Sequence, residues 1–133
     1  MNIWLGGFKG TDGGLGGGVY RVYLKSSDLN VPGASTLWVF LDMREDSIDV
    51  GNFATDMRGW ENKGASYGFY DLPGYYHHNS CGFSFADGHS ELHYWKDPRT
   101  RPTLVKGALI PDQFPSPNNQ DVAWLQFHSS RPK

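Results

Sequence analysis

The chain has 133 residues, 38% of them hydrophobic and 15% aromatic, and a formal net charge of −2 at pH 7. This length fits one domain with one modest core, so we expect a single domain over residues 1–133. A net charge of −2 gives no electrostatic reason to expect binding to nucleic acid or to an anionic membrane. The single cysteine, Cys81, excludes an internal disulfide framework, and we expect it to be a small buried residue rather than a nucleophile.

The first segment, residues 1–18, is dominated by glycine, with eight Gly in "GGFKGTDGGLGGG" (6–18). It lacks the Gly-Lys-Ser/Thr ending of a phosphate-binding loop, so we expect a flexible loop. The next segment, "VYRVYLKSSDL" (19–29), alternates apolar and polar residues and predicts a strand that closes in a turn or a short helix. This strand would open a sheet core over residues 19–96.

The segment "ASTLWVFLDMRED" (34–46) has the strongest strand signal in the chain. Its unbroken apolar run, residues 37–41, is consistent with burial on both faces and predicts a central strand over 36–42. An acidic cluster follows within eight residues: Asp42, Glu45, Asp46 and Asp49.

A second strand signal surrounds Asp87-Gly88, in "YYHHNSCGFSFADGHSELHYW" (75–95). This dipeptide between strand-like runs predicts a β-hairpin over 82–95 with a two-residue turn. Pairing outward from the turn sets Phe83 opposite Leu92 and predicts a core face and an opposite face. The core face would hold Phe83, Phe85, Leu92 and Tyr94, and the other face would hold Ser84, His89, Glu91 and His93.

Beyond residue 96 we expect an irregular wrapping tail, 97–133, pinned by Trp124 and Leu125 in a short turn of helix. The expected fold is therefore α+β to mainly β, with a small antiparallel sheet and long loops. The sequence as given has no run of about 18 apolar residues and no targeting signal, so we expect no membrane contact by this chain.

The loop before the hairpin carries His77 and His78, and His77 can fold back to hydrogen-bond Asp87. That contact would be either a structural lock or half of a His–Asp general-base pair. The two histidines His89 and His93 would lie about 13 Å apart on a regular strand and could not share one zinc ion.

The same residues resemble a known motif: His77, nine residues, then Asp87-Gly88 is similar to the H-X9-DG motif of prepilin-type proteins. The resemblance implies a type II secretion major pseudopilin-like protein, in which His77, Asp87 and Gly88 form a structural motif. It extends to "TLWVFLDMREDSIDVGNFA" (36–54), "DLPGYYHH" (71–78), "FADGHSELHYWKDPRTRP" (85–102) and "NNQDVAWLQ" (118–126).

The resemblance implies a globular domain that follows a cleavage motif and a long apolar helix. The sequence as given contains neither, so we expect the pseudopilin-like globular part alone. The implied partners are other pseudopilin subunits or secretion-system components, at the periplasmic face of the inner membrane or outside the cell. The chain itself we expect to be a monomer or a weak dimer.

The resemblance also implies calcium, which pseudopilins of this kind often bind in their C-terminal loops. Calcium takes six to eight oxygen ligands. The candidate ligands are Asp42, Glu45, Asp46 and Asp49. Their spacing does not match an EF-hand loop, and a solvated acidic turn is the alternative.

Three classes of function stay open at this point, with a structural pseudopilin-like module favoured. The second is a small metal-assisted hydrolase of esters or lactones, in which calcium polarises a carbonyl or activates water. Its catalytic residues would be His77, His78 and Asp87. The third is a carbohydrate-binding module that stacks sugars on Trp60, Tyr75 and Tyr76.

Overall fold

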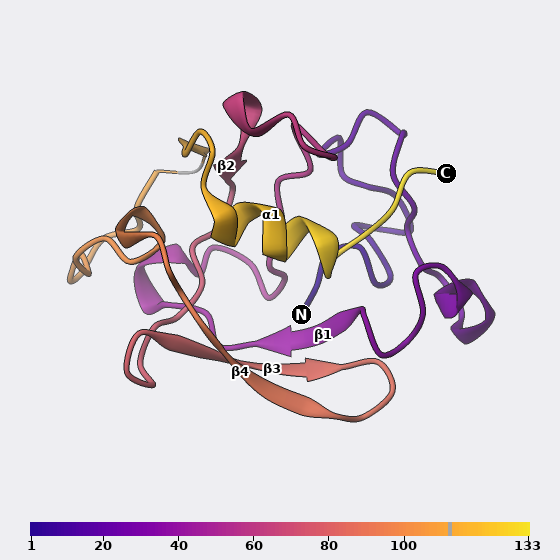
Figure 1. The fold of residues 1–133 in the computed structure, drawn as a ribbon, viewed down its shortest axis with the longest axis horizontal. Coiled ribbons are helices and arrows are strands. Elements are labelled where there is room, and N and C mark those ends of the chain that lie inside the picture. The colour runs from indigo at the N-terminus through magenta and orange to yellow at the C-terminus, as the bar shows by residue number, and fades with distance from the viewer. Residues whose placement is uncertain (112) are drawn as a thin grey trace.

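The computed structural model describes residues 1–111 and 113–133, and its strands form two small antiparallel sheets (Figure 1). The larger sheet has the order β1-β3-β4, with β1 at Trp38–Leu41, β3 at Ser80–Phe85 and β4 at Ser90–Tyr94. The smaller sheet pairs β2 (Gly68–Phe69) with β5 (Phe114–Pro115). The described helices are α1 (Gln120–Phe127) and the 3-10 helices Ser26–Asn30, Glu45–Ser47, Gly64–Ser66 and Pro98–Thr100.

This combination of one α-helix, two small antiparallel sheets and long loops among the described residues confirms the expected α+β class. Helix α1 lies across one face of the three-stranded sheet, so the fold has two layers at this point (Figure 1). The side chain of Asn119 accepts a hydrogen bond from the Asp121 N–H at 2.8 Å and caps the start of the helix. As expected, Leu125 is buried, and the Trp124 ring packs 4.9 Å from the Phe83 ring.

The central strand of the larger sheet is β3, and the expectation that the 36–42 strand is central is wrong. Strand β1 lies at the edge, and the side chain of Phe40 is 58% exposed. Trp38 points into the core and is 0% exposed. An unbroken apolar run therefore did not mean burial on both faces, because the solvent face of this sheet also carries aromatic side chains.

The predicted hairpin is present as β3 and β4, but its turn is one residue longer than expected. The Gly88 N–H donates to the Phe85 carbonyl at 3.0 Å, and the Phe85 N–H donates to the His89 carbonyl at 2.9 Å. Gly88 has φ +95°, in the left-handed region. This is a three-residue loop, in which a type I turn is followed by a glycine bulge.

The longer turn shifts the register, so that Phe83 pairs with Glu91 and Gly82 with Leu92. Because side chains alternate along a strand, a one-residue shift moves every side chain to the opposite face. The expected faces of β4 are therefore wrong: Leu92 is 66% exposed, whereas Trp95 is buried and His93 is partly buried. The predicted faces of β3 hold, with Phe83 and Phe85 in the core.

The N-terminal part of the chain forms a second apolar cluster around Trp4, which is 0% exposed. The strand expected over 19–29 is wrong, because this segment makes isolated bridges, Leu5 with Tyr23 and Tyr20 with Pro132, and no ladder. The short helix expected at its end is present as the 3-10 helix Ser26–Asn30.

The glycine-rich residues 6–18 form successive turns. The carboxylate of Asp12 accepts hydrogen bonds from the N–H groups of Gly14, at 3.1 Å, and Gly18, at 2.7 Å. These bonds lower the pKa of Asp12, because they favour its charged form. Asp12 therefore closes the second half of this loop, residues 12–18.

Candidate functional site

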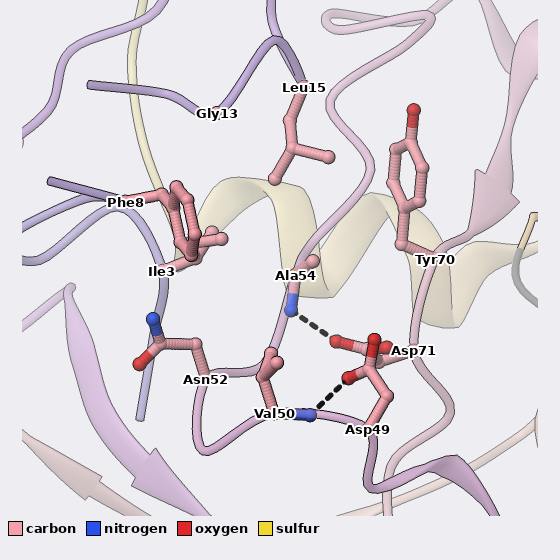
Figure 2. A pocket seen from close by; sticks show the side chains of 10 residues that line it. All are labelled: Ile3, Phe8, Gly13, Leu15, Asp49, Val50, Asn52, Ala54, Tyr70 and Asp71. Atoms are coloured by element: carbon pink, nitrogen blue, oxygen red, sulfur yellow. Dashed lines mark hydrogen bonds between the residues drawn. The ribbon is translucent and has the colours of Figure 1, made fainter.

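A pocket of about 330 Å³ lies between the glycine-rich loop and residues 49–54, as Figure 2 shows. Its wall is mostly apolar, with the side chains of Ile3, Phe8, Leu15 and Tyr70 facing the hollow. This volume is at the lower end of the range of small-molecule sites.

Two carboxylates line the same pocket (Figure 2). Asp71 is buried and accepts a hydrogen bond from the Ala54 N–H at 2.5 Å. Asp49 is exposed and accepts one from the Val50 N–H at 2.5 Å. An apolar wall beside two acidic groups suits an apolar side chain or molecule that carries a positive charge.

Of the four predicted calcium ligands, Asp46 is the most deeply buried, and it is paired with Arg44. The Arg44 guanidinium donates to both carboxylate oxygens, at 2.5 and 2.6 Å, and the Val105 N–H donates to Asp46 at 2.7 Å. The bonds from Arg44 are the main cause that lowers the pKa of Asp46. This carboxylate therefore holds residues 44–46 against the loop at 102–105.

The other three predicted ligands have separate partners. Glu45 accepts a hydrogen bond from the Tyr76 hydroxyl, Asp49 lies in the pocket of Figure 2, and Asp42 faces His77. Among residues 1–111 and 113–133, no group of three or more His, Cys, Asp or Glu side chains is arranged to hold a metal ion. Calcium binding by this turn stays a prediction.

His77 and Asp87, the ends of the H-X9-DG motif, do not contact each other, and the expected hydrogen bond between them is wrong. The Nε2 atom of His77 lies 3.3 Å from Asp42, and Asp87 lies 2.6 Å from the Nδ1 atom of His89. Strand β3 separates them, and six residues of extended chain span about 20 Å. Asp87 also accepts from the His89 N–H, so its carboxylate stabilises the turn.

The Asp42–His77 pair is a His–Asp contact at the surface, with side chains 48% and 56% exposed. His78 is next to it, exposed, with φ +50° in the turn before β3. Cys81 is buried behind Asp42, and its Sγ lies 3.3 Å from the Asp42 carbonyl. Burial raises the pKa of this thiol to about 12, so it is protonated at neutral pH and is no nucleophile.

The three aromatic residues considered for sugar binding have other contacts. The Arg131 guanidinium lies over the Trp60 ring at 4.9 Å, and Arg131 also covers Phe127. Tyr75 and Tyr76 stack on each other with their ring centres 6.0 Å apart. Arg44 lies 5.6 Å from the centre of the Tyr75 ring. Each of the three rings therefore has an aromatic or guanidinium partner, and sugar binding stays a prediction.

Two residues make contacts in the interior that the sequence did not predict: Asp121 and His93. Asp121 is buried and accepts hydrogen bonds from the backbone of Lys96 and Asp97 and from the hydroxyl of Thr100. The His93 ring stacks on Trp124 at 3.7 Å, and its Nε2 atom is buried without a hydrogen-bond partner. The polar run "NNQD" (118–121) could have indicated a helix cap at most, because the partners of Asp121 lie more than 20 residues earlier.

Comparison with known proteins gives no match: no family model, no curated protein and no solved structure is similar to this chain. The described part of the chain also holds no helix with the length and hydropathy that crossing a bilayer requires. What this protein does must therefore be argued from the contacts of its own residues.

Proposed function

We propose that this chain is a structural module of the pseudopilin type, related to the fibre subunits of type II secretion. One observation supports this proposal above the others: the acidic residues of the resembling motifs bind backbone groups of their own chain. The clearest case is Asp121, whose carboxylate accepts from two backbone N–H groups and one hydroxyl. These bonds attach the segment after β4 to the start of α1.

The other motif residues act in the same way. Asp97 accepts from the Arg99 N–H at 2.9 Å and caps the 3-10 helix Pro98–Thr100. Asp87 accepts from the His89 N–H at 3.2 Å and closes the hairpin turn. Asn119 caps α1. Each of these bonds closes a local turn or caps a helix, and Asp121 in addition joins two segments that are distant in sequence.

Catalysis requires titratable groups that converge on a pocket where the substrate can bind. None of Asp87, Asp97 and Asp121 lines the pocket of Figure 2. A carboxylate that is saturated by its own backbone is poorly placed to move a proton. The motif residues are suited to hold a surface in shape, which is what a fibre subunit requires.

As such a module, the domain would contact other pseudopilin subunits or secretion-system components, at the periplasmic face of the inner membrane or outside the cell. The test is a chimera that places this domain behind the N-terminal helix of a major pseudopilin, in a host that lacks its own. We expect fibres that contain the domain, visible by electron microscopy with an antibody against it. A chimera that is folded and abundant but never enters fibres would contradict the proposal.

The alternative, a metal-assisted hydrolase, is favoured by two exposed His–Asp pairs, Asp42–His77 and Asp87–His89. A screen of short esters and acyl lactones, with and without a chelator, tests it. The variants are His77→Ala and His78→Ala, and His128→Ala is the control, since the ring of His128 bonds to the Thr36 carbonyl instead of a carboxylate. Chelator-sensitive turnover that is lost in the first two and kept in the control would replace the structural proposal.

A further inference from the structure

Strand β4 is the outer strand of the three-stranded sheet, and one of its edges is open. The Trp95 N–H donates to Asn79 and the Phe85 N–H donates to His89, so every second residue of this strand bonds toward β3. The backbone groups of the residues between them point away from β3. These are the backbone N–H and C=O groups of Ser90, Leu92 and Tyr94, and within the described parts of the chain they make no hydrogen bond.

The opposite edge of the same sheet is closed. The Asn2 N–H donates to the Val39 carbonyl at 2.9 Å, and the Trp38 N–H donates to the His128 carbonyl at 3.2 Å. The N-terminal segment and the end of α1 therefore cover β1. An open strand edge readily pairs with another strand, which is why proteins usually cover or blunt it.

The residues with open backbone groups also carry exposed apolar side chains. Leu92 is 66% exposed and Tyr94 is 53% exposed, both on the face of the sheet away from α1. Phe40 of β1, on the same face, is 58% exposed. A strand that pairs with β4 would satisfy its backbone groups and cover part of this apolar surface.

We propose that the occupant is a second copy of this chain, paired antiparallel through β4 about a two-fold axis at Leu92. In this register Leu92 meets Leu92, and Ser90 meets Tyr94, so every outward-pointing backbone group of β4 gains a partner. Glu91 lies opposite His93, which avoids placing like charges across the pair. A register centred on Glu91 would instead set two carboxylates directly opposite each other.

The symmetric pairing is also closed with respect to the three-stranded sheet, because each copy uses the open edge at β4 and the opposite edge at β1 is covered. A pair of five-residue strands buries less than the roughly 1,200–2,000 Å² of a stable interface, so the dimer is weak and depends on concentration. The pairing needs only the strand edge and does not depend on the proposed fibre role.

Cysteine cross-linking tests the register. In Leu92→Cys the two Cα atoms across the axis would lie about 5.5 Å apart, within the range that a disulfide can bridge. In Tyr94→Cys the two copies of residue 94 would lie about 13 Å apart, which a disulfide cannot bridge. The native Cys81 is buried, so the wild type is the background control.

Under mild oxidation at high protein concentration, we expect Leu92→Cys to form at least tenfold more covalent dimer than Tyr94→Cys or the wild type. Equal cross-linking of the two variants, or none in Leu92→Cys, would overturn the proposed register.

Sedimentation equilibrium provides a second measurement without cysteines. We expect Leu92→Lys, which places a charge on the axis, to weaken self-association at least tenfold. Phe40→Lys is the matched control, since Phe40 is similarly exposed on the same face but lies on the closed strand. If Phe40→Lys weakens association as much, or if the wild type does not associate, pairing through the β4 edge is wrong.

Discussion

Asp121 is 1% exposed, and its carboxylate is the point where three separate donors converge. The donors come from residues 96–100, which follow β4, while Asp121 itself lies in the first turn of α1. A buried carboxylate is stable only when such donors compensate for its lost hydration. Asp121 therefore joins residues 96–100 to the first turn of α1, two segments that are distant in sequence.

We expect Asp121→Ala to lower the free energy of unfolding by roughly 3 kcal/mol, because it leaves one buried and two partly buried donors without an acceptor. Asp121→Asn keeps one acceptor oxygen and should cost less. Urea denaturation at pH 7 measures both. Asp49→Ala is the control, since that carboxylate is exposed, and it should change stability by less than about 0.5 kcal/mol. An Asp121→Ala protein as stable as this control would contradict the role given to Asp121.

His93 lies among Phe83, Trp95 and Trp124, and this burial lowers its pKa from 6.5 to about 4. The unfolded chain takes up the proton near pH 6.5, whereas the folded chain does so only near pH 4. The stability linked to His93 is therefore fully present above pH 6.5. It is lost progressively as the pH falls toward 4.

We expect the wild type to lose roughly 3 kcal/mol of unfolding free energy through His93 between pH 6.5 and 4. His93→Phe keeps an aromatic ring against Trp124 and removes the titrating group. Its unfolding free energy should fall less steeply over the same interval, with His128 accounting for part of the remaining slope, because burial lowers the pKa of that residue too. Parallel profiles for the two proteins in urea titrations would contradict this assignment.

The hairpin is the element whose geometry decides which residues face the core. Its turn places Gly88 at φ +95°, where a side chain is strained although no atom lies within 4 Å of a Cβ added there. The register follows from this turn, and the register sets His93 inward and Leu92 outward. The aromatic cluster under α1 thus depends on a conformation that glycine adopts without cost.

We expect Gly88→Ala to destabilise the protein by about 1 kcal/mol through backbone strain alone. Gly51→Ala is a matched control, because Gly51 has equal free space and no positive φ. It should be neutral or slightly stabilising in the same chemical denaturation experiment. Equal effects of the two substitutions would argue against a strained position at residue 88.

At the scale of the whole molecule, the two ends of the chain meet at the edge of the sheet. The Asn2 side chain donates to the carbonyls of Trp38 and Ser129, at 3.0 and 3.3 Å, and the Trp38 indole donates to the Ser129 hydroxyl at 2.9 Å. All three residues are buried. The last part of the chain, residues 119–130, therefore contributes buried side chains to the core, whereas none of residues 101–111 is buried.

Calcium is tested by the thermal stability of the whole protein. An ion that binds only the folded state at a hundredfold excess over Kd stabilises it by about 2.7 kcal/mol, which raises Tm by several degrees for a chain of this size. If the acidic turn at 42–49 binds calcium, melting curves with calcium and with EDTA should differ by that amount. Asp42→Asn combined with Glu45→Gln should then abolish the difference. Identical curves for the wild type would exclude the site.

The sequence by itself determined the class of fold, the hairpin at Asp87-Gly88, the short helix near Trp124 and the burial of Cys81. These features depend on local signals, which are turn chemistry, alternation of apolar residues and composition. Tertiary structure decided the rest. The turn length moved Leu92 to the surface, and the strand order put β1 at the edge of the sheet, where the N-terminal segment covers it. Asp42 rather than Asp87 became the partner of His77. Which residues become partners depends on how distant segments pack together, so the spacing of residues along the sequence cannot predict these contacts.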